Sequence, residues 1–241
     1  MSGHSKWSKV KRQKGITDIQ KGRVFAKLSK LITMAVIEGG GIGDPAHNVK
    51  LRFIIEKARQ ENMPKDNIER AIEKASGPNK LALKEVHYEA FAKHGVALLI
   101  IATTDNANRT TSEVKNALDR HGSKLGIPGS VSYLFQHCMV VVLNKSDNTE
   151  EIVFKFAETM NAYDIEEEGD SYTMYIPFQN AGKLKDHSGT LKIVSHEIEY
   201  RPLTSIQIPK EEEQLVIELI EALEDLDDVQ SVFTNTMFTT L

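Results

Sequence analysis

The stretch Val96-Ala97-Leu98-Leu99-Ile100-Ile101-Ala102 is apolar at every position. A continuous apolar run of this length predicts a strand buried on both faces, so we expect it to be central in its sheet. Just before it, Val86, Tyr88 and Ala90 alternate with polar neighbours and predict a second strand. A period of two therefore begins after residue 80, and sheet structure begins with it.

Residues 1–80 have a helical period instead. A helix is expected to start at Thr17 and to stop at Gly39-Gly40-Gly41, because glycine is unfavourable inside a helix. A second helix is predicted over residues 46–61. Pro64 suits the first turn of a third, which ends before Gly77-Pro78. Three helices with short connections predict a small bundle.

Downstream of the central strand, the pattern predicts a helix over residues 111–120 and a strand over residues 130–135. Residues 139–200 then alternate as strand, helix, strand, strand, helix, strand, the order of a ferredoxin-like unit. Strands at residues 205–208 and 229–234 flank a last helix, and the final strand is expected to return to the first sheet. We predict an α+β protein of three domains: residues 1–80, residues 81–137 with 203–241, and an inserted ferredoxin-like domain at residues 138–202.

The charge is divided unevenly along the chain. The first 80 residues contain 17 Lys and Arg but 8 Asp and Glu, although the whole chain has a net charge of −4. Nine of those cations precede Ile37, where Asp18 is the single acid. Because clustered Lys and Arg neutralise phosphates regardless of sequence, this inversion of charge favours a nucleic-acid partner.

Features of an enzyme or membrane protein are not evident. No apolar run approaches the ~20 residues that span a bilayer, and the amino end lacks the apolar core of a secretory signal. The lone Cys138 lies in an apolar run, which fits a buried thiol in a reducing compartment, so we expect a cytoplasmic protein. The eight histidines lack metal-ligand spacing. We expect no metal, no cofactor, no small-molecule substrate and no catalysis.

One cluster at the end of the central strand has two interpretations. Residues 103–111 are rich in Thr, Asn and Asp and lead from a strand into a helix, where sheet proteins often bind ligands. Asp105 or Asn106 would cap that helix. Arg109 would then either belong to the turn alone or bind a phosphate or RNA.

Several motifs together resemble the YebC/PmpR family, which includes the mitochondrial translational activator of cytochrome c oxidase subunit I. They are Gly3-His4-Ser5-Lys6-Trp7, Gly39-Gly40-Gly41, Asn62-Met63-Pro64-Lys65-Asp66-Asn67-Ile68 and Asn106-Ala107-Asn108-Arg109-Thr110. The resemblance covers nearly the whole chain. It implies the same three-domain fold, with a ferredoxin-like domain inserted into an α+β domain.

The resemblance also implies a function. The family has been labelled as probable transcriptional regulators that bind DNA, while other members act in translation on the ribosome, relieving stalling at proline-rich stretches. Since the basic residues are spread over an arm and a helix and form no recognition helix, we favour ribosomal RNA and keep a DNA-binding transcriptional regulator as the alternative. The residues expected to contact nucleic acid are His4, Lys6, Trp7, Lys9, Lys11, Arg12, Lys14, Lys21, Arg23, Lys27, Lys30, Pro64, Lys65, Asn67 and Arg109. Trp7 would either stack on a base or pack onto the protein and anchor the arm.

Overall fold

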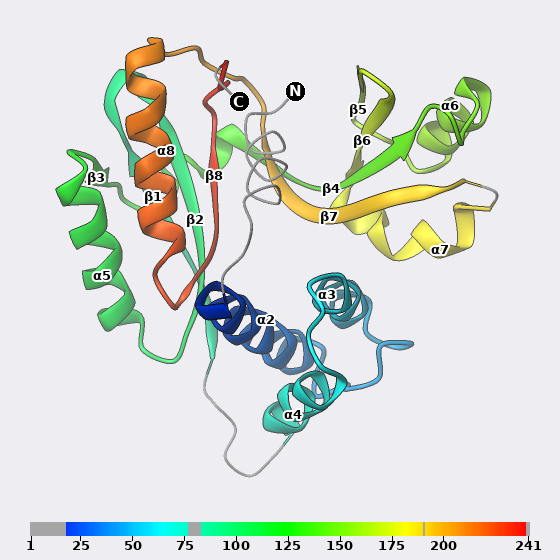
Figure 1. The fold of residues 1–241 in the computed structure, drawn as a ribbon, viewed down its shortest axis with the longest axis horizontal. Coiled ribbons are helices and arrows are strands. Elements are labelled where there is room, and N and C mark those ends of the chain that lie inside the picture. The colour runs from blue at the N-terminus through cyan, green and yellow to red at the C-terminus, as the bar shows by residue number, and fades with distance from the viewer. Residues whose placement is uncertain (1–17, 77–82, 190, 240–241) are drawn as a thin grey trace. The chain divides into compact units, whose positions relative to one another are not determined.

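The computed structural model describes residues 18–76, 83–189 and 191–239 (Figure 1). It divides the chain into two compact units: one is Phe135–Leu203, and the other comprises the residues on both sides of that segment. The helix start expected at Thr17 lies outside the described residues.

Three helices of the larger unit share one apolar core, as the helical period of the sequence predicts. They are α2 (Asp18–Glu38), α3 (Val49–Gln60) and α4 (Lys65–Ser76). The turn after α2 requires glycine, because Gly40 and Gly41 have φ of 70° and 90°. Asn48 caps α3 by accepting the backbone N–H of Leu51 at 3.0 Å, and its amide donates to the carbonyls of Ala35 and Ile42. This cap makes α3 begin three residues later than the predicted start.

The sheet of the larger unit has the strand order β3-β1-β2-β8. The pairings of β1 (Lys84–Phe91), β2 (Ala97–Thr104), β3 (Lys124–Leu125) and β8 (Val229–Thr234) are all antiparallel. β2 lies between β1 and β8, which confirms the central position predicted for the apolar stretch. Helices α5 (Ala107–Arg120) and α8 (Lys210–Glu224) pack on one face of this sheet (Figure 1).

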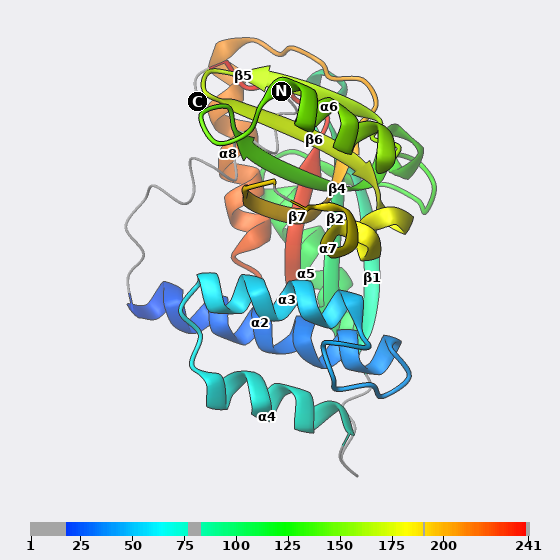
Figure 2. The same cartoon turned by 90° about the vertical axis from the view of Figure 1, so that its right-hand side faces the viewer.

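The unit Phe135–Leu203 contains the predicted order of strand, helix, strand, strand, helix, strand. Its elements are β4 (Phe135–Asn144), α6 (Glu150–Thr159), β5 (Asp164–Glu168), β6 (Ser171–Pro177), α7 (Leu184–His187) and β7 (Ile193–Pro202). They form an antiparallel sheet of order β5-β6-β4-β7 (Figure 2). Cys138 is fully buried in it, and burial, followed by the nearby charge of Glu199, raises the pKa of the thiol to about 12. The predicted buried thiol is confirmed.

Two predicted strands are wrong. Residues 130–135 form a loop and a short 3-10 turn, Ser132–Leu134, and only Phe135 belongs to a strand. The backbone N–H groups of Val131 and Ser132 bind the carboxylate of Glu89, so they are not free to pair with a neighbouring strand. Residues 205–208 form a single bridge, between Ile206 and Thr236, instead of a strand.

Candidate nucleic-acid interface

The basic arm, residues 2–14, lies outside the described residues. Seven of the predicted contacts belong to it, and the two roles weighed for Trp7 stay predictions. These contacts are His4, Lys6, Trp7, Lys9, Lys11, Arg12 and Lys14. The structure therefore bears only on the predicted residues from Lys21 onwards.

The cations of α2 face an acidic turn formed by residues 224–229, which joins α8 to β8. The ammonium of Lys27 donates to the carbonyl oxygens of Glu224 and Val229. Glu224 is the last residue of α8, where carbonyls have no partner within the helix and a cation is favoured. Arg23 Nη1 lies 3.4 Å from Asp225 Oδ1, with both side chains more than half exposed. Part of the basic helix thus binds an acidic segment of the same chain.

Lys30, also on α2, binds Asp228, whose carboxylate is at the centre of a network of hydrogen bonds. Lys30 Nζ lies 2.6 Å from Asp228 Oδ1 and 3.0 Å from the carbonyl oxygen of Asp227. The other carboxylate oxygen of Asp228 accepts from Arg109 Nη2 at 2.7 Å, Thr110 Oγ1 at 2.7 Å and Thr104 Oγ1 at 2.9 Å. One carboxylate therefore joins side chains from α2, β2 and α5.

The carboxylate of Asp228 is held in its charged form. Its side chain is 3% exposed, and burial alone would raise its pKa. The four donors from Lys30, Arg109, Thr110 and Thr104 outweigh burial, so the pKa of Asp228 falls below its ordinary value. Asp228 is ionised at neutral pH and paired with two cations.

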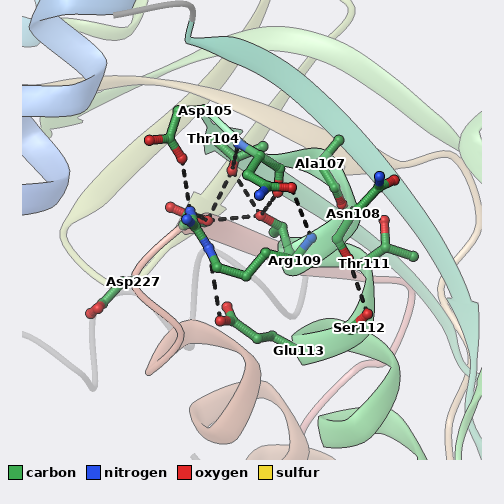
Figure 3. Close-up of polar contacts among 12 residues, drawn as sticks. Thr104, Asp105, Ala107, Asn108, Arg109, Thr111, Ser112, Glu113 and Asp227 are labelled. Carbon is green, nitrogen blue, oxygen red and sulfur yellow. Dashed lines mark hydrogen bonds and ion pairs between the residues drawn. The ribbon is translucent and has the colours of Figure 1, made fainter.

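Arg109 is surrounded by acids (Figure 3). Besides Asp228, its guanidinium lies 2.9 Å from Asp105 and 4.0 Å from Glu113. The hydrogen bond with Asp228 is the largest cause of a raised pKa for Arg109. Asn106 Oδ1 accepts the backbone N–H of Arg109 at 3.2 Å, which confirms the predicted cap. The geometry favours the structural interpretation of Arg109, because its anionic partners come from this chain, and a phosphate contact there stays a prediction.

A second ion-pair group links α3 to the sheet. Lys50 Nζ lies 2.6 Å from Glu38 and 3.3 Å from Glu85 of β1. The pKa of Glu85 is lowered to about 2, first by the hydrogen bond with His87 and also by the charge of Lys50. The helices of the larger unit are thus tied to its sheet at two places, through Asp228 and through Glu85.

The predicted contact at the start of α4 is an exposed turn. Met63 is buried in the helical core, while Pro64 is exposed and the Lys65 side chain is 84% exposed beside Glu69, at 3.2 Å. Asn67 Oδ1 accepts from Arg70 Nη2 at 2.6 Å. Pro64 and Lys65 are accessible to a partner, but they do not converge with Arg109 in any described contact.

The exposed cations of the three helices lie mainly outside the contacts with the acidic turn. They are Lys21, Arg23, Lys57, Arg59, Lys65, Arg70 and Lys74. The exposed face of α4 mixes its cations with Asp66, Glu69 and Glu73. Such a mixed face is poorly suited to a nucleic-acid groove, whose walls are phosphates.

Sequence reasoning missed Asp228, Thr104 and Thr110 as members of one network. Asp228 is separated from Thr110 by 118 positions, so no local motif indicates the contact. The available signal was complementary charge: α2 is rich in Lys and Arg, and residues 224–228 contain four acids. Because the last strand was expected to return to the first sheet, this complementary charge could have suggested that residues 224–228 contact α2.

Over the described ranges, no three His, Cys, Asp or Glu side chains are placed to hold a metal ion. A shallow depression at the start of α6 is lined by Thr149, Glu150, Glu151 and Phe154, and no cation is among these residues. Among the helices that the structure describes, none is long and apolar enough to cross a membrane.

Comparison with known proteins gives matches over nearly the whole chain. The sequence model for the N-terminal domain of TACO1/YebC proteins matches residues 5–78, and that for their second and third domains matches residues 83–236. A probable transcriptional regulatory protein of Methylacidiphilum infernorum is 42% identical, over 98% of this chain and 95% of its own length. A protein of the same description from Thermus thermophilus is 39% identical, over 98% and 96%. The crystal structure of a conserved hypothetical protein from Aquifex aeolicus superposes with a TM-score of 0.78 at 37% identity, covering 92% of each chain.

Proposed function

The chain belongs to the TACO1/YebC family, and on this premise we propose that it is a non-enzymatic regulator of gene expression that binds nucleic acid. The observation that supports this proposal most is the concentration of positive charge in the first 80 residues of an acidic protein. The names of its relatives also describe regulators of gene expression.

Binding of nucleic acid would be mainly electrostatic. The arm offers Lys6, Lys9, Lys11, Arg12 and Lys14 within nine residues, and no acid lies among them. Phosphate contacts by these cations would release counterions and give a steep salt dependence. Lys21 of α2 would continue this surface onto the folded body.

The cations of α2 have two roles in this proposal: some bind the acidic turn, and others contact nucleic acid. Lys27 and Lys30 bind residues 224–229, so we assign them to holding α2 against the sheet. Arg109 supports the same contact from the other side of Asp228. In this proposal these three residues orient the basic surface and do not themselves neutralise phosphates.

We favour RNA of the ribosome as the partner. A reader of DNA sequence needs side chains on one exposed helix that can reach base edges. The exposed face of α4 includes three carboxylates among its cations, and the exposed cations of α3 lie in its last turn. A dispersed basic surface suits recognition of RNA shape and backbone. Action at the ribosome, relieving stalling at proline-rich stretches, is what resemblance to the translational members of the family implies.

The alternative is a DNA-binding transcriptional regulator. It is favoured by the names of the relatives, which describe probable transcriptional regulatory proteins. The two candidate functions differ in the sequence specificity of binding. A transcriptional regulator would bind an operator in the presence of excess competitor DNA at physiological salt, whereas a backbone binder would lose affinity for all sequences as salt rises.

The test compares binding of a large-subunit rRNA fragment and a DNA duplex by fluorescence anisotropy across a salt series. Replacing the five arm cations with Ala should reduce the slope of log K against log salt by roughly 3.5 to 4.5, since each lost contact contributes about 0.7 to 0.9. The matched control replaces five exposed lysines from the remainder of the chain: Lys115, Lys155, Lys183, Lys192 and Lys210.

We expect the control variant to keep the wild-type slope and affinity. Equal effects of the two five-fold replacements would show that net charge alone governs binding, which would remove the arm from the proposal. Preference for a discrete duplex over rRNA at physiological salt would favour the transcriptional alternative.

A further inference from the structure

The loop between β3 and β4, residues 126–134, is fixed by a buried carboxylate. Glu89 of β1 is 6% exposed and accepts hydrogen bonds from the backbone N–H groups of Gly129 at 2.7 Å, Val131, and Ser132 at 2.9 Å. Burial would raise the pKa of Glu89, but these three bonds, together with one from the Ser132 side chain, lower the pKa by more. The charged carboxylate thus binds three N–H groups of one loop, and these bonds fix the conformation of the loop.

Two glycines allow this close packing. A Cβ on Gly126 would lie 2.5 Å from Ser130 Oγ and 3.2 Å from the carbonyl oxygen of Glu89. Gly129 has φ of 87°, a region that side chains rarely adopt. Val131 is fully buried and anchors the centre of the loop. The loop therefore has a defined conformation, fixed by the close packing at Gly126 and by the buried Val131.

What the loop displays is apolar. Ile127 is 76% exposed and Tyr133 is 68% exposed, although the backbone between them is bound to Glu89. Phe91 of β1, paired with Lys124 of β3, is 40% exposed beside this loop. Exposed aromatic groups on a fixed support are typical of a recognition surface, because little entropy is lost when they bind.

The charge around the loop indicates the class of partner. No Asp or Glu occurs from residue 120 to residue 146, in a chain with 34 acids. Arg120 and Lys124 are exposed in this segment. The Glu89 carboxylate is buried, with its charge compensated by the loop amides. An exposed tyrosine in a segment that has exposed cations and no Asp or Glu matches the way proteins bind unpaired nucleic-acid bases, by stacking and phosphate attraction.

We propose that the loop of residues 126–134 is a second nucleic-acid contact, at which Tyr133 stacks on an unpaired base and Lys124 attracts the adjacent phosphate. This inference rests on the proposed function and extends it from a backbone contact to recognition of single-stranded RNA. Duplex nucleic acid, whose bases are stacked on each other, would gain nothing from this loop.

The probe is a hairpin RNA with an unpaired uridine loop, compared with the same RNA closed by a complementary strand. Tyr133→Ala should weaken hairpin binding between about 5-fold and about 150-fold, the range for loss of one stacked base. Its salt slope should not change, because no phosphate contact is lost. Tyr133→Phe retains the ring and should stay within about twofold of wild type. Tyr163→Ala, an exposed tyrosine of the other unit, is the matched control and should have no effect.

A direct readout is photo-crosslinking from 4-thiouridine in the hairpin loop, followed by mass spectrometry, which should identify the peptide containing Tyr133. Unchanged hairpin binding by Tyr133→Ala, with binding lost in the arm variant, would overturn this inference and leave the proposed function standing. Weaker binding to whole ribosomes without weaker hairpin binding would overturn it in favour of a protein partner. A wild type that binds DNA but no RNA would overturn this inference alone, and a wild type that binds neither nucleic acid would overturn both.

Discussion

Replacement of Asp228 with Asn tests whether the buried carboxylate holds α2 and α5 to the sheet. The change keeps the shape of the side chain but removes its charge and turns one acceptor into a donor. In one amide orientation the new NH₂ group opposes Lys30, and in the other it opposes Arg109, Thr104 and Thr110. No orientation satisfies all four donors.

The expected cost follows from the burial of those donors. Breaking a buried ion pair from one side costs about 3 to 5 kcal/mol. Lys30 and Arg109 have side chains that are 30% and 46% exposed, so water can replace part of their interaction. Thr104 and Thr110 are almost fully buried. We therefore expect a loss of about 3 kcal/mol in the free energy of unfolding of the larger unit.

The assay is urea denaturation combined with hydrogen exchange, because a chain of two compact units need not unfold in one step. Exchange should accelerate in α2 and in the first turn of α5, and not in the unit Phe135–Leu203. Asp227→Asn is the matched control. Asp227 is exposed and only its backbone carbonyl binds Lys30, so it should change stability by less than about 0.5 kcal/mol. Equal stability of the two variants would refute the role assigned to Asp228.

Three further outcomes are expected. Glu89→Gln should destabilise the larger unit by about 1 to 3 kcal/mol, because an amide cannot accept all three hydrogen bonds from the loop N–H groups. Hydrogen exchange should become faster at residues 129–132, and unchanged exchange there would contradict the role of Glu89. Since the pKa of Glu85 is about 2 in the folded protein against an ordinary 4.5, its stabilisation should be complete above pH 4.5 and decrease as the pH falls from there toward 2. Urea midpoints of Glu85→Gln should therefore depend less on pH in that window, and identical pH profiles would exclude the contribution. Cys138, buried and with a pKa of about 12, should react with a thiol reagent only in denaturant, and rapid labelling of the native protein would contradict its burial.

Much of the fold could be predicted from local pattern. The continuous apolar stretch from Val96 indicated a central strand, and β2 is central. Helix stops at Gly39-Gly40-Gly41 and near Gly77 follow from the cost of glycine and proline in helices. Such features depend on neighbouring residues only, which is why the sequence alone indicates them.

The errors arose where a distant side chain determines the backbone. Residues 130–135 have the composition of a strand, but Glu89, about forty positions earlier, binds their N–H groups. Arg109 had two interpretations because its partner Asp228 is 119 positions away. The charge pattern indicated a nucleic-acid partner and the motifs indicated the family, whereas only the structure showed which cations bind the acidic turn.

The measurement that tests the central claim most directly is crosslinking in cells, followed by sequencing of the nucleic acid attached to the protein. The wild type, the five-alanine arm variant and the matched five-lysine control should be compared at equal abundance. We predict that the wild type and the control recover ribosomal RNA of the large subunit and that the arm variant does not. Recovery of discrete promoter DNA without ribosomal RNA, or full recovery of ribosomal RNA by the arm variant, would contradict the account.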